Sequence, residues 1–337
     1  MKKYKVIVVG ATGAVGREMI RTLENRNFPI QVLKLLASSR SAGSKIKFKN
    51  NELTVEELNK NFFKGFDIAI FSAGGDTSKK FAPYAAEAGC YCIDNSSAWR
   101  MEKDIPLVVP EVNPEVLQKG RYIIANPNCS TIQMVVALKP IHDLAKIKRV
   151  VVSTYQAVSG AGQKGILDLK EQLTAIENGE TVHVNNFQYQ IANNLIPHID
   201  VFMDDGYTKE EVKMIKETNK ILNDFDLKIT ATTVRVPVYR GHAESINIET
   251  KDPLSAKEAK SVLSKAAGVI VQDDLSKNEY PMPISSEGKY ETFVGRIRED
   301  KTVKNGLNIW VVSDNLLKGA ASNAVQIAET LVFKGIV

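Results

Sequence analysis

An apolar strand followed by spaced glycines constrains the fold of this chain most. Lys5 to Val9 is a β-branched run, and Gly10, Gly13 and Gly16 follow it before a helical pattern that continues to about Asn25. Glycines at this spacing, a variant of the dinucleotide fingerprint, let the chain turn tightly and let a diphosphate approach the helix N-terminus. The alternative is a plain strand-to-helix turn. The position after an N-terminal strand favours a Rossmann-type nucleotide-binding domain.

Further strands alternate with helices in the first half of the chain. Apolar runs predict strands at 32–36, 67–71, 90–94, 107–109 and 122–125, with a helix at about 78–88. Strands that are apolar throughout indicate a parallel, doubly wound α/β sheet.

The pattern changes after about Ala145. Longer strands are predicted at 150–156, 228–238, 244–250 and 306–313, without a regular helix between each pair. We therefore expect an α+β second domain with a largely antiparallel sheet. Residues 273–292 are expected to form a surface loop, and residues 319–333 a helix with apolar side chains at helical spacing.

Composition excludes several classes of protein. The chain has 337 residues, which suggests two domains, and its net charge of +5 is spread without a basic block for nucleic acid. No apolar run approaches the roughly 18 residues of a membrane span, and no signal peptide is expected. Three cysteines favour a reducing compartment, so we expect a cytoplasmic protein. Cys90 and Cys92 are interpreted as packing residues, and no metal site is expected.

The end of the second strand indicates which nucleotide binds. An NAD site usually ends this strand with an acid that binds the ribose hydroxyls. Here Ala37 is followed by Ser38, Ser39 and Arg40, so an arginine lies beside hydroxyl groups instead. This chemistry suits a 2′-phosphate and predicts NADP rather than NAD. A solvated loop arginine is the alternative.

A cysteine lies where a predicted strand becomes a helix. Tyr122 to Ala125 leads into Asn126-Pro127-Asn128-Cys129, and an apolar helix follows. The helix dipole and free backbone N–H groups at such a position favour the thiolate of Cys129 and can hold an oxyanion. With a nicotinamide cofactor, this thiolate predicts an aldehyde dehydrogenase cycle through a thiohemiacetal and a thioester. A small buried thiol is the alternative.

Other charged side chains are candidates for the same site. His242 follows a glycine between two strands and is a candidate general base. Arg235, inside a β-rich run, could bind a carboxylate, and Arg100 could bind phosphate, although either could form an internal salt bridge. Glu210 and Lys213 share one face of a helix that opens with a Thr208–Glu211 capping box, but taken alone this pattern is an ordinary solvated helix start and marks no site.

Seven motifs, in this order, together resemble the bacterial type of aspartate-β-semialdehyde dehydrogenase. They lie at residues 10–16, 95–100, 126–131, 154–162, 210–213, 235–238 and 240–242. The resemblance implies a glyceraldehyde-3-phosphate dehydrogenase-like fold. Its NADP-binding Rossmann-type domain would comprise residues 1–127 and 316–337, and its α+β catalytic and dimerisation domain residues 128–315.

The resemblance also implies a reaction and roles for residues. The reaction is the reversible, NADPH-dependent reductive dephosphorylation of L-aspartyl-4-phosphate to L-aspartate-4-semialdehyde, on the route to lysine, threonine and methionine. Cys129 would be the nucleophile, His242 the acid/base, and Gln156 would position the substrate. Arg235 would bind the substrate carboxylate and Glu210 its amine.

The phosphate and cofactor sites follow from the same resemblance. Arg100, Lys213 and Asn95 would bind the phosphate released as inorganic phosphate. The NADP-binding residues would be Gly10, Thr12, Gly13, Ala14, Val15, Ser39, Arg40, Ser159, Gly160 and Asn315. The protein would form a homodimer or tetramer.

Two other functions compete with this one. N-acetyl-γ-glutamyl-phosphate reductase carries out the same chemistry on an acylated substrate, but that family tends to have a glycine before its cysteine and an aromatic-proline pair after it. This chain has Asn128 there and then Ser130-Thr131, and Glu210 favours a free substrate amine. A non-catalytic NADP-binding regulator would need the glycine loop but would have no use for Cys129 and His242.

Overall fold

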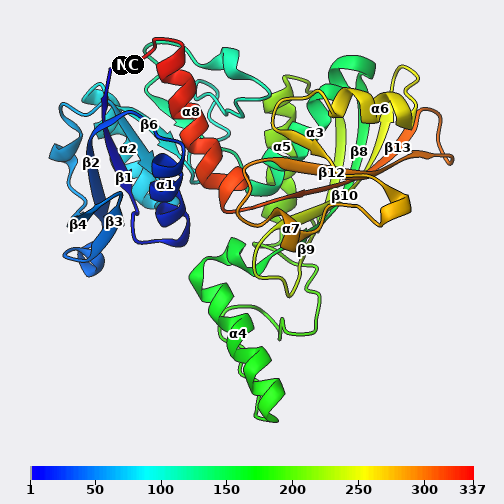
Figure 1. The fold of residues 1–337 in the computed structure, drawn as a ribbon, viewed down its shortest axis with the longest axis horizontal. Helices are drawn as coiled ribbons and strands as arrows, with labels where there is room; N and C mark the ends of the chain where they lie inside the picture. Colours follow the sequence, from blue (N-terminus) through cyan, green and yellow to red (C-terminus); the bar gives the residue numbers. More distant parts are fainter. Residues whose placement is uncertain (1) are drawn as a thin grey trace. The chain divides into compact units, whose positions relative to one another are not determined.

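The computed structural model describes residues 2–337 and divides into two compact units. The first unit contains the chain up to Asn128 together with Ala320–Val337, and the second unit is Cys129–Gly319 (Figure 1). Within residues 2–337, no helix is both long and apolar enough to cross a membrane.

The first unit is built on a seven-stranded sheet in the order β3-β4-β2-β1-β5-β6-β7. All neighbouring strands are parallel except β3 and β4, which form an antiparallel hairpin. The strands are β1 (Tyr4–Val9), β2 (Ile30–Ala37), β3 (Lys45–Phe48), β4 (Asn51–Glu57), β5 (Ile68–Phe71), β6 (Tyr91–Asp94) and β7 (Ile123–Ala125). The helices are α1 (Ala14–Asn25), α2 (Gly75–Glu87) and α8 (Ser322–Phe333). The predicted Rossmann-type sheet is thereby confirmed.

Both faces of β1 are buried, as is typical of a parallel strand between helix layers. Val6 and Val8 belong to the apolar cluster that includes Met19 of α1 and side chains of α8. Ile7 and Val9 belong to a second cluster with Ala82 and Ala85 of α2. This packing fixes the carboxyl end of β1, where the glycine loop begins.

The second unit is built on a six-stranded sheet in the order β11-β12-β13-β10-β8-β9. The central pairs β8–β10, β10–β13 and β12–β13 are antiparallel, whereas β8–β9 and β11–β12 are parallel. The strands are β8 (Ile147–Gln156), β9 (Lys228–Arg235), β10 (His242–Thr250), β11 (Val269–Val271), β12 (Thr292–Asp300) and β13 (Gly306–Ser313). The largely antiparallel sheet predicted for this half is confirmed.

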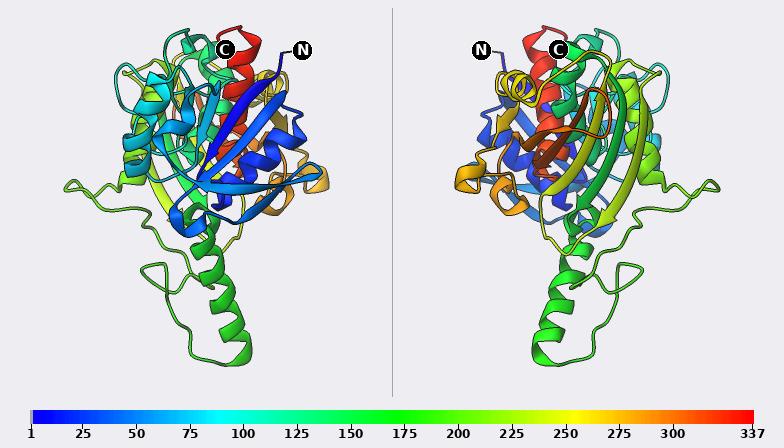
Figure 2. Two further views of the ribbon diagram at one scale, coloured as in Figure 1. Left: turned by 90° about the vertical axis from the view of Figure 1, so that its left-hand side faces the viewer. Right: turned by 90° about the vertical axis from the view of Figure 1, so that its right-hand side faces the viewer.

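Three helices cover one face of this second sheet, while another projects from the unit. Helices α3 (Cys129–Ala145), α5 (Lys209–Leu222) and α6 (Ala256–Leu263) contact the sheet. Helix α4 (Gln163–Asn178) extends away from the sheet (Figures 1 and 2).

Several boundaries differ from the sequence prediction. The strand predicted at 107–109 is wrong, because only Leu107 makes an isolated bridge, to Ala125. Strand β9 ends at Arg235 and not at 238, since Pro237 has no N–H for the ladder. The predicted loop 273–292 contains the short helix α7 (Pro283–Ser286). The last helix begins at Ser322, after a π-helical turn at Leu317–Ala321.

Candidate active site

The register of the second sheet brings predicted site residues into one row. Gln156 at the end of β8 is paired with Arg235 of β9. Ala243 of β10 is opposite Tyr155 of β8, so His242 continues the same row next to Gln156. Partners in register share a face of the sheet, and this face is covered by α3 and α5. Three residues far apart in sequence therefore lie side by side.

His242 is completely buried, and its ring is held at one nitrogen. The backbone N–H of Ala157 donates to Nδ1 of His242 over 3.0 Å. The pKa of His242 is lowered well below its ordinary value by burial and by the positive charge of Arg235. A neutral ring that accepts at Nδ1 carries its proton at Nε2, and Nε2 has no hydrogen-bond partner among residues 2–337. A buried donor without a partner is costly, and a substrate oxygen would supply the partner.

A second group of charged side chains extends from Gln156. Gln156 donates from Nε2 to Oε1 of Glu210 over 3.2 Å, and Lys213 contacts the other Glu210 oxygen at 3.1 Å. Lys213 also pairs with Asp200 at 2.6 Å. Burial opposes the charge of Lys213, but Glu210 and Asp200 outweigh it and raise its pKa. Thr208 caps helix α5 with the predicted capping box, and Glu210 lies in the first turn of α5.

Arg235 connects the two groups electrostatically. Its Nη1 donates to the carbonyl of Ala157 over 2.7 Å. Burial lowers the pKa of Arg235, while Glu210 and then Cys129 act to raise it. The guanidinium is thus a buried cation that the carboxylate of Glu210 and a thiolate at Cys129 help to stabilise, and it is suited to a further anionic group.

Cys129 is the first residue of α3, as the sequence predicts, and it is partly exposed. Cys90 and Cys92 are fully buried, and burial raises the pKa of both thiols, so neither is suited to act as a nucleophile. Gly319 packs against the cysteine: a Cβ on Gly319 would lie 2.8 Å from Cβ of Cys129. Sequence reasoning did not identify Gly319, because nothing local marks a glycine in a helical segment as a contact of Cys129.

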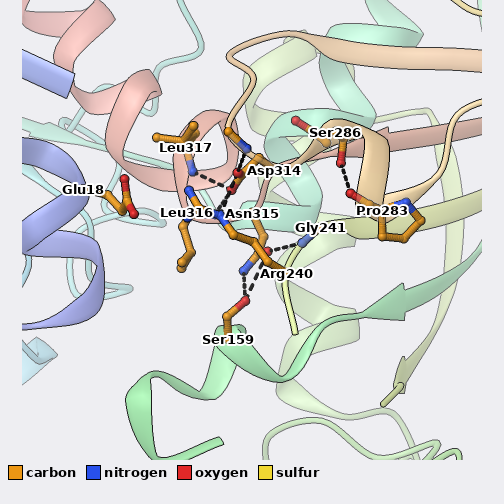
Figure 3. Close-up of polar contacts among 12 residues, drawn as sticks. Glu18, Ser159, Arg240, Gly241, Pro283, Ser286, Asp314, Asn315, Leu316 and Leu317 are labelled. Carbon is orange, nitrogen blue, oxygen red and sulfur yellow. Dashed lines mark hydrogen bonds and ion pairs between the residues drawn. The ribbon is translucent and has the colours of Figure 1, made fainter. Parts of the chain in front are cut away.

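The second-unit residues assigned to the cofactor lie around the same histidine. Asn315 donates from Nδ2 to Oγ of Ser159 over 3.0 Å, and its Oδ1 accepts from the backbone N–H of Gly241 at 2.9 Å (Figure 3). Gly160 leaves no room for a side chain, since a Cβ would lie 2.8 Å from Nη1 of Arg235 and 3.4 Å from Nε2 of His242. The loop 159–160 therefore borders the His242–Arg235 row.

The segment that carries His242 is held by a buried carboxylate. Asp314 pairs with Arg240 at 2.7 Å and accepts from the backbone N–H of Gly288 at 2.8 Å (Figure 3). Its other oxygen accepts from the N–H groups of Leu316 and Leu317. This network fixes the turn before His242 relative to the end of β13.

The first unit contains a cavity of about 520 Å³ at the glycine loop. Gly10, Thr12, Gly13, Ser38 and Ser39 are among the residues that line it. A Cβ on Gly10, whose φ is +78°, would lie 2.3 Å from the carbonyl oxygen of Ser72. Ala14 and Val15 form the first turn of α1, so free helix N–H groups are available beside the loop. These features fit a dinucleotide diphosphate.

The two sides of the predicted 2′-phosphate site differ in charge. Arg40 is exposed in the short 3₁₀ turn Ser39–Ser41 that adjoins the cavity. Glu57, at the end of β4, also lines the cavity and is paired in register with Ala37. The sequence prediction considered only acids on the second strand and missed the one supplied by its neighbour.

Two of the residues assigned to phosphate lie together in the first unit. Nη2 of Arg100 donates to the carbonyl oxygen of Asn95 over 2.9 Å, and Asn126 donates to Oδ1 of Asn95 over 2.7 Å. Arg100 is buried, so its charge is held close to the main chain after β6. The third residue, Lys213, belongs to the second unit.

Comparisons with known proteins agree with this arrangement. Residues 5–120 match the family model "Semialdehyde dehydrogenase, NAD binding domain", and residues 138–318 match "Semialdehyde dehydrogenase, dimerisation domain". The chain is 61% identical to an aspartate-semialdehyde dehydrogenase from Aquifex aeolicus, with 99% of each chain covered.

Solved structures with bound ligands are also similar. Aspartate semialdehyde dehydrogenase II from Vibrio cholerae, complexed with ASA, superposes with a TM-score of 0.96 at 48% identity over 99% of each chain. The Candida albicans enzyme, solved with NADP, superposes with a TM-score of 0.77 at 27% identity over 100% of each chain.

Proposed function

Because the chain belongs to the aspartate-semialdehyde dehydrogenase family, we propose that its buried row of Arg235, Gln156 and His242, with Cys129, is the catalytic site of that reaction. The protein catalyses the reversible, NADP-dependent conversion of L-aspartyl-4-phosphate to L-aspartate-4-semialdehyde. The observation that carries the residue assignment is the Nε2 donor of His242, which is buried next to an arginine and has no partner in the described part of the chain.

Cys129 is assigned as the nucleophile. Its thiolate attacks the carbonyl carbon of the acyl phosphate, a C–S bond forms, and the C–O bond to phosphate breaks. The first turn of α3 favours the thiolate through its dipole, and the nearby charge of Arg235 acts in the same direction. NADPH, when bound, supplies the hydride that reduces the resulting thioester.

His242 is assigned to the oxygen of the reacting carbonyl. From Nε2 it donates a hydrogen bond to the oxyanion that forms at the carbon bonded to Cys129. A full acid/base role, as the family resemblance implies, needs a charged ring with a proton on both nitrogens. The ring must therefore release the Ala157 N–H before it can accept a second proton.

Binding of the amino acid end is assigned to three side chains. Arg235 holds the α-carboxylate, Glu210 attracts the amine, and Gln156 lies between them and orients the substrate toward Cys129. Lys213 together with Arg100 and Asn95 is assigned to the phosphate. A cation there lowers the cost of the leaving group's charge.

The cofactor is assigned to the glycine loop and its neighbours. In the first unit, Gly10, Thr12, Gly13, Ala14 and Val15 hold the diphosphate, and Ser39 with Arg40 binds the 2′-phosphate. In the second unit, we assign Ser159, Gly160 and Asn315 to the same cofactor. The domain boundaries expected from the sequence, 1–127 with 316–337 and 128–315, remain part of the proposal.

The second unit matches a dimerisation domain, so the protein forms an oligomer. A similar enzyme was solved in complex with ASA, which supports a small-molecule substrate for this protein. We propose a homodimer or tetramer. Light scattering at the protein concentrations used for assay separates these two states from a monomer.

The assay that tests the function follows NADPH formation from L-aspartate-4-semialdehyde and NADP⁺, with and without inorganic phosphate. Turnover that depends on phosphate supports the acyl-phosphate step. Turnover without phosphate would mean that water resolves the thioester, which makes the protein a hydrolytic aldehyde dehydrogenase. The Cys129→Ser variant serves as the control: it should lose turnover and still bind NADP, and retained activity would exclude Cys129 as the nucleophile.

A further inference from the structure

Glu244 is a buried acid directly behind the catalytic row. It lies two residues after His242 on β10, so both side chains point to the same face of the sheet. In register it is flanked by Thr154 of β8 and Val311 of β13. The next row along the strands is apolar and contains Val152, Ala231, Ile246 and Ile309. Glu244 therefore separates the site from the apolar core.

The surroundings of Glu244 do not compensate a negative charge. The side chain is 0% exposed, and no hydrogen bond ends at Oε1 or Oε2 within residues 2–337. Its carboxyl group interacts with the side chain of Gln133, and no cation contributes to its environment. Burial raises the pKa of Glu244 well above its ordinary value, and the contact with Gln133 opposes this only in part. A buried carboxylate in such a place is strongly disfavoured relative to the neutral acid.

Gln133 links the two elements that carry the reacting groups. It lies four residues after Cys129 on α3, so both side chains are on the same helix face. Its Nε2 donates to the backbone carbonyl of His242 over 3.4 Å, while its Oε1 is buried without a partner among residues 2–337. A protonated Glu244 has an O–H that Oε1 of Gln133 can accept, and Gln133 has a second N–H for the other carboxyl oxygen. One proton on Glu244 thus satisfies both unpartnered groups.

We infer that Glu244 is a neutral carboxylic acid that forms a hydrogen-bonded pair with Gln133, and that this pair holds Cys129 on α3 in position relative to His242 on β10. Glu244 and Gln133 are positioning residues, since neither contacts the reacting atoms directly. Their role rests on the roles proposed above for Cys129 and His242. Such a pair matters because a small misplacement of a reactive group by a change outside the chemistry can cost about 100-fold in rate.

The test compares a variant that keeps the pair with two that remove it. Glu244→Gln keeps a neutral donor and acceptor of the same shape, so kcat should stay close to wild type. Glu244→Leu and Gln133→Leu should each lower kcat by about 100-fold with little change in KM for the semialdehyde. Because the two residues act as one unit, the kcat of the double variant Glu244→Leu/Gln133→Leu should be no lower than that of the less active single variant.

Two readouts do not depend on turnover. The first is the rate at which iodoacetamide alkylates Cys129, which should change in Glu244→Leu and not in Glu244→Gln. The rate reports on Cys129 alone, because Cys90 and Cys92 are buried. The second is the infrared C=O band of a protonated carboxylic acid, which should be present in the wild type at neutral pH and absent in Glu244→Gln. The matched control is Ile248→Ala on the same face of β10, which should lower stability without lowering kcat.

Several outcomes would overturn the role of Glu244. A loss of kcat in Glu244→Gln as large as in Glu244→Leu would mean that an ionisable group is needed. A normal kcat and alkylation rate in Glu244→Leu would exclude positioning, and absence of the carboxylic acid band in the wild type would exclude the neutral state. If Glu244→Leu does not fold, the carboxylic acid band of the wild type and the kcat of Glu244→Gln still test the proposal. Failure of the proposed function is distinct, because it would appear as inactive wild-type enzyme with the band intact.

Discussion

The backbone N–H of Ala157 donates to Nδ1 of His242, and this bond decides which proton the histidine can offer. Nδ1 cannot carry a proton while it accepts one hydrogen bond from the main chain, so the neutral ring presents N–H at Nε2. Burial and the charge of Arg235, which lower the pKa of His242, act to keep the ring neutral. In this conformation the proposed role of His242 is to stabilise an oxyanion by donating a hydrogen bond and not by full proton transfer.

Two variants of His242 separate donation from proton transfer. His242→Ala should lower kcat by roughly 10²–10⁴-fold, the usual worth of a positioned acid/base or oxyanion donor. His242→Gln places an amide N–H near the position of Nε2 and should recover part of this loss. Steady-state kinetics with both substrates provides the measurement. If His242→Gln is as slow as His242→Ala, proton transfer is the essential role, and a loss confined to KM would make His242 a binding group.

Gly160 can be tested against two roles at once. In Gly160→Ala the new Cβ would lie 2.8 Å from Nη1 of Arg235, so the guanidinium must move away from Ala157. We expect KM for the semialdehyde to rise about 10-fold or more, because a charged hydrogen bond to the carboxylate is weakened. KM for NADP is measured on the same samples. If only KM for NADP rises, Gly160 serves the cofactor and its contact with Arg235 is incidental.

Arg40 and Glu57 carry opposite charges at the proposed 2′-phosphate site, so we expect them to affect NADPH binding in opposite directions. Arg40→Ala should weaken NADPH binding by about 10-fold and NADH binding much less, since only NADPH carries the 2′-phosphate. Glu57→Gln removes a negative charge from the cavity and should strengthen NADPH binding. Fluorescence titration with both nucleotides measures the dissociation constants, and Arg121→Ala, also an exposed arginine of the first unit, controls for net charge. Equal losses for NADPH and NADH in Arg40→Ala would remove the 2′-phosphate assignment.

Local signals in the sequence predicted the parts of the structure that local physics determines. The strand and helix around Gly10 and the helix that begins at Cys129 are where the pattern indicated, because glycine conformation and helix starts depend on a few neighbouring residues. The capping box of Thr208 and Glu211 is also present.

Features that depend on distant neighbours were missed. Glu244 is a strand residue with no sequence mark of its own, and only the register with β8 and β13 and the approach of Gln133 reveal it. Residues 107–109 are as apolar as a strand, but they lie buried beside β7 with a single bridge. An apolar run indicates that a segment is buried. Whether the segment is also a strand depends on backbone hydrogen bonds to a neighbouring strand that is distant in the sequence.

Ionisation of Glu244 gives the stability of the protein a defined dependence on pH. The pKa of Glu244 is raised in the folded state above its ordinary value of 4.5, which we take for the unfolded chain. Below that pH both states hold the proton. Above it the unfolded chain releases the proton while the folded chain keeps it, so the free energy of unfolding falls by about 1.4 kcal/mol per pH unit until the folded pKa is reached.

Glu244→Gln lacks this contribution, and all other groups cancel in the difference between the two proteins. Urea unfolding at several pH values should therefore show that the free energy of unfolding of Glu244→Gln rises relative to that of the wild type as pH rises above 4.5. A difference that stays constant over this range would mean that Glu244 ionises normally in the folded protein, and the pair with Gln133 would then have to be held by a charge.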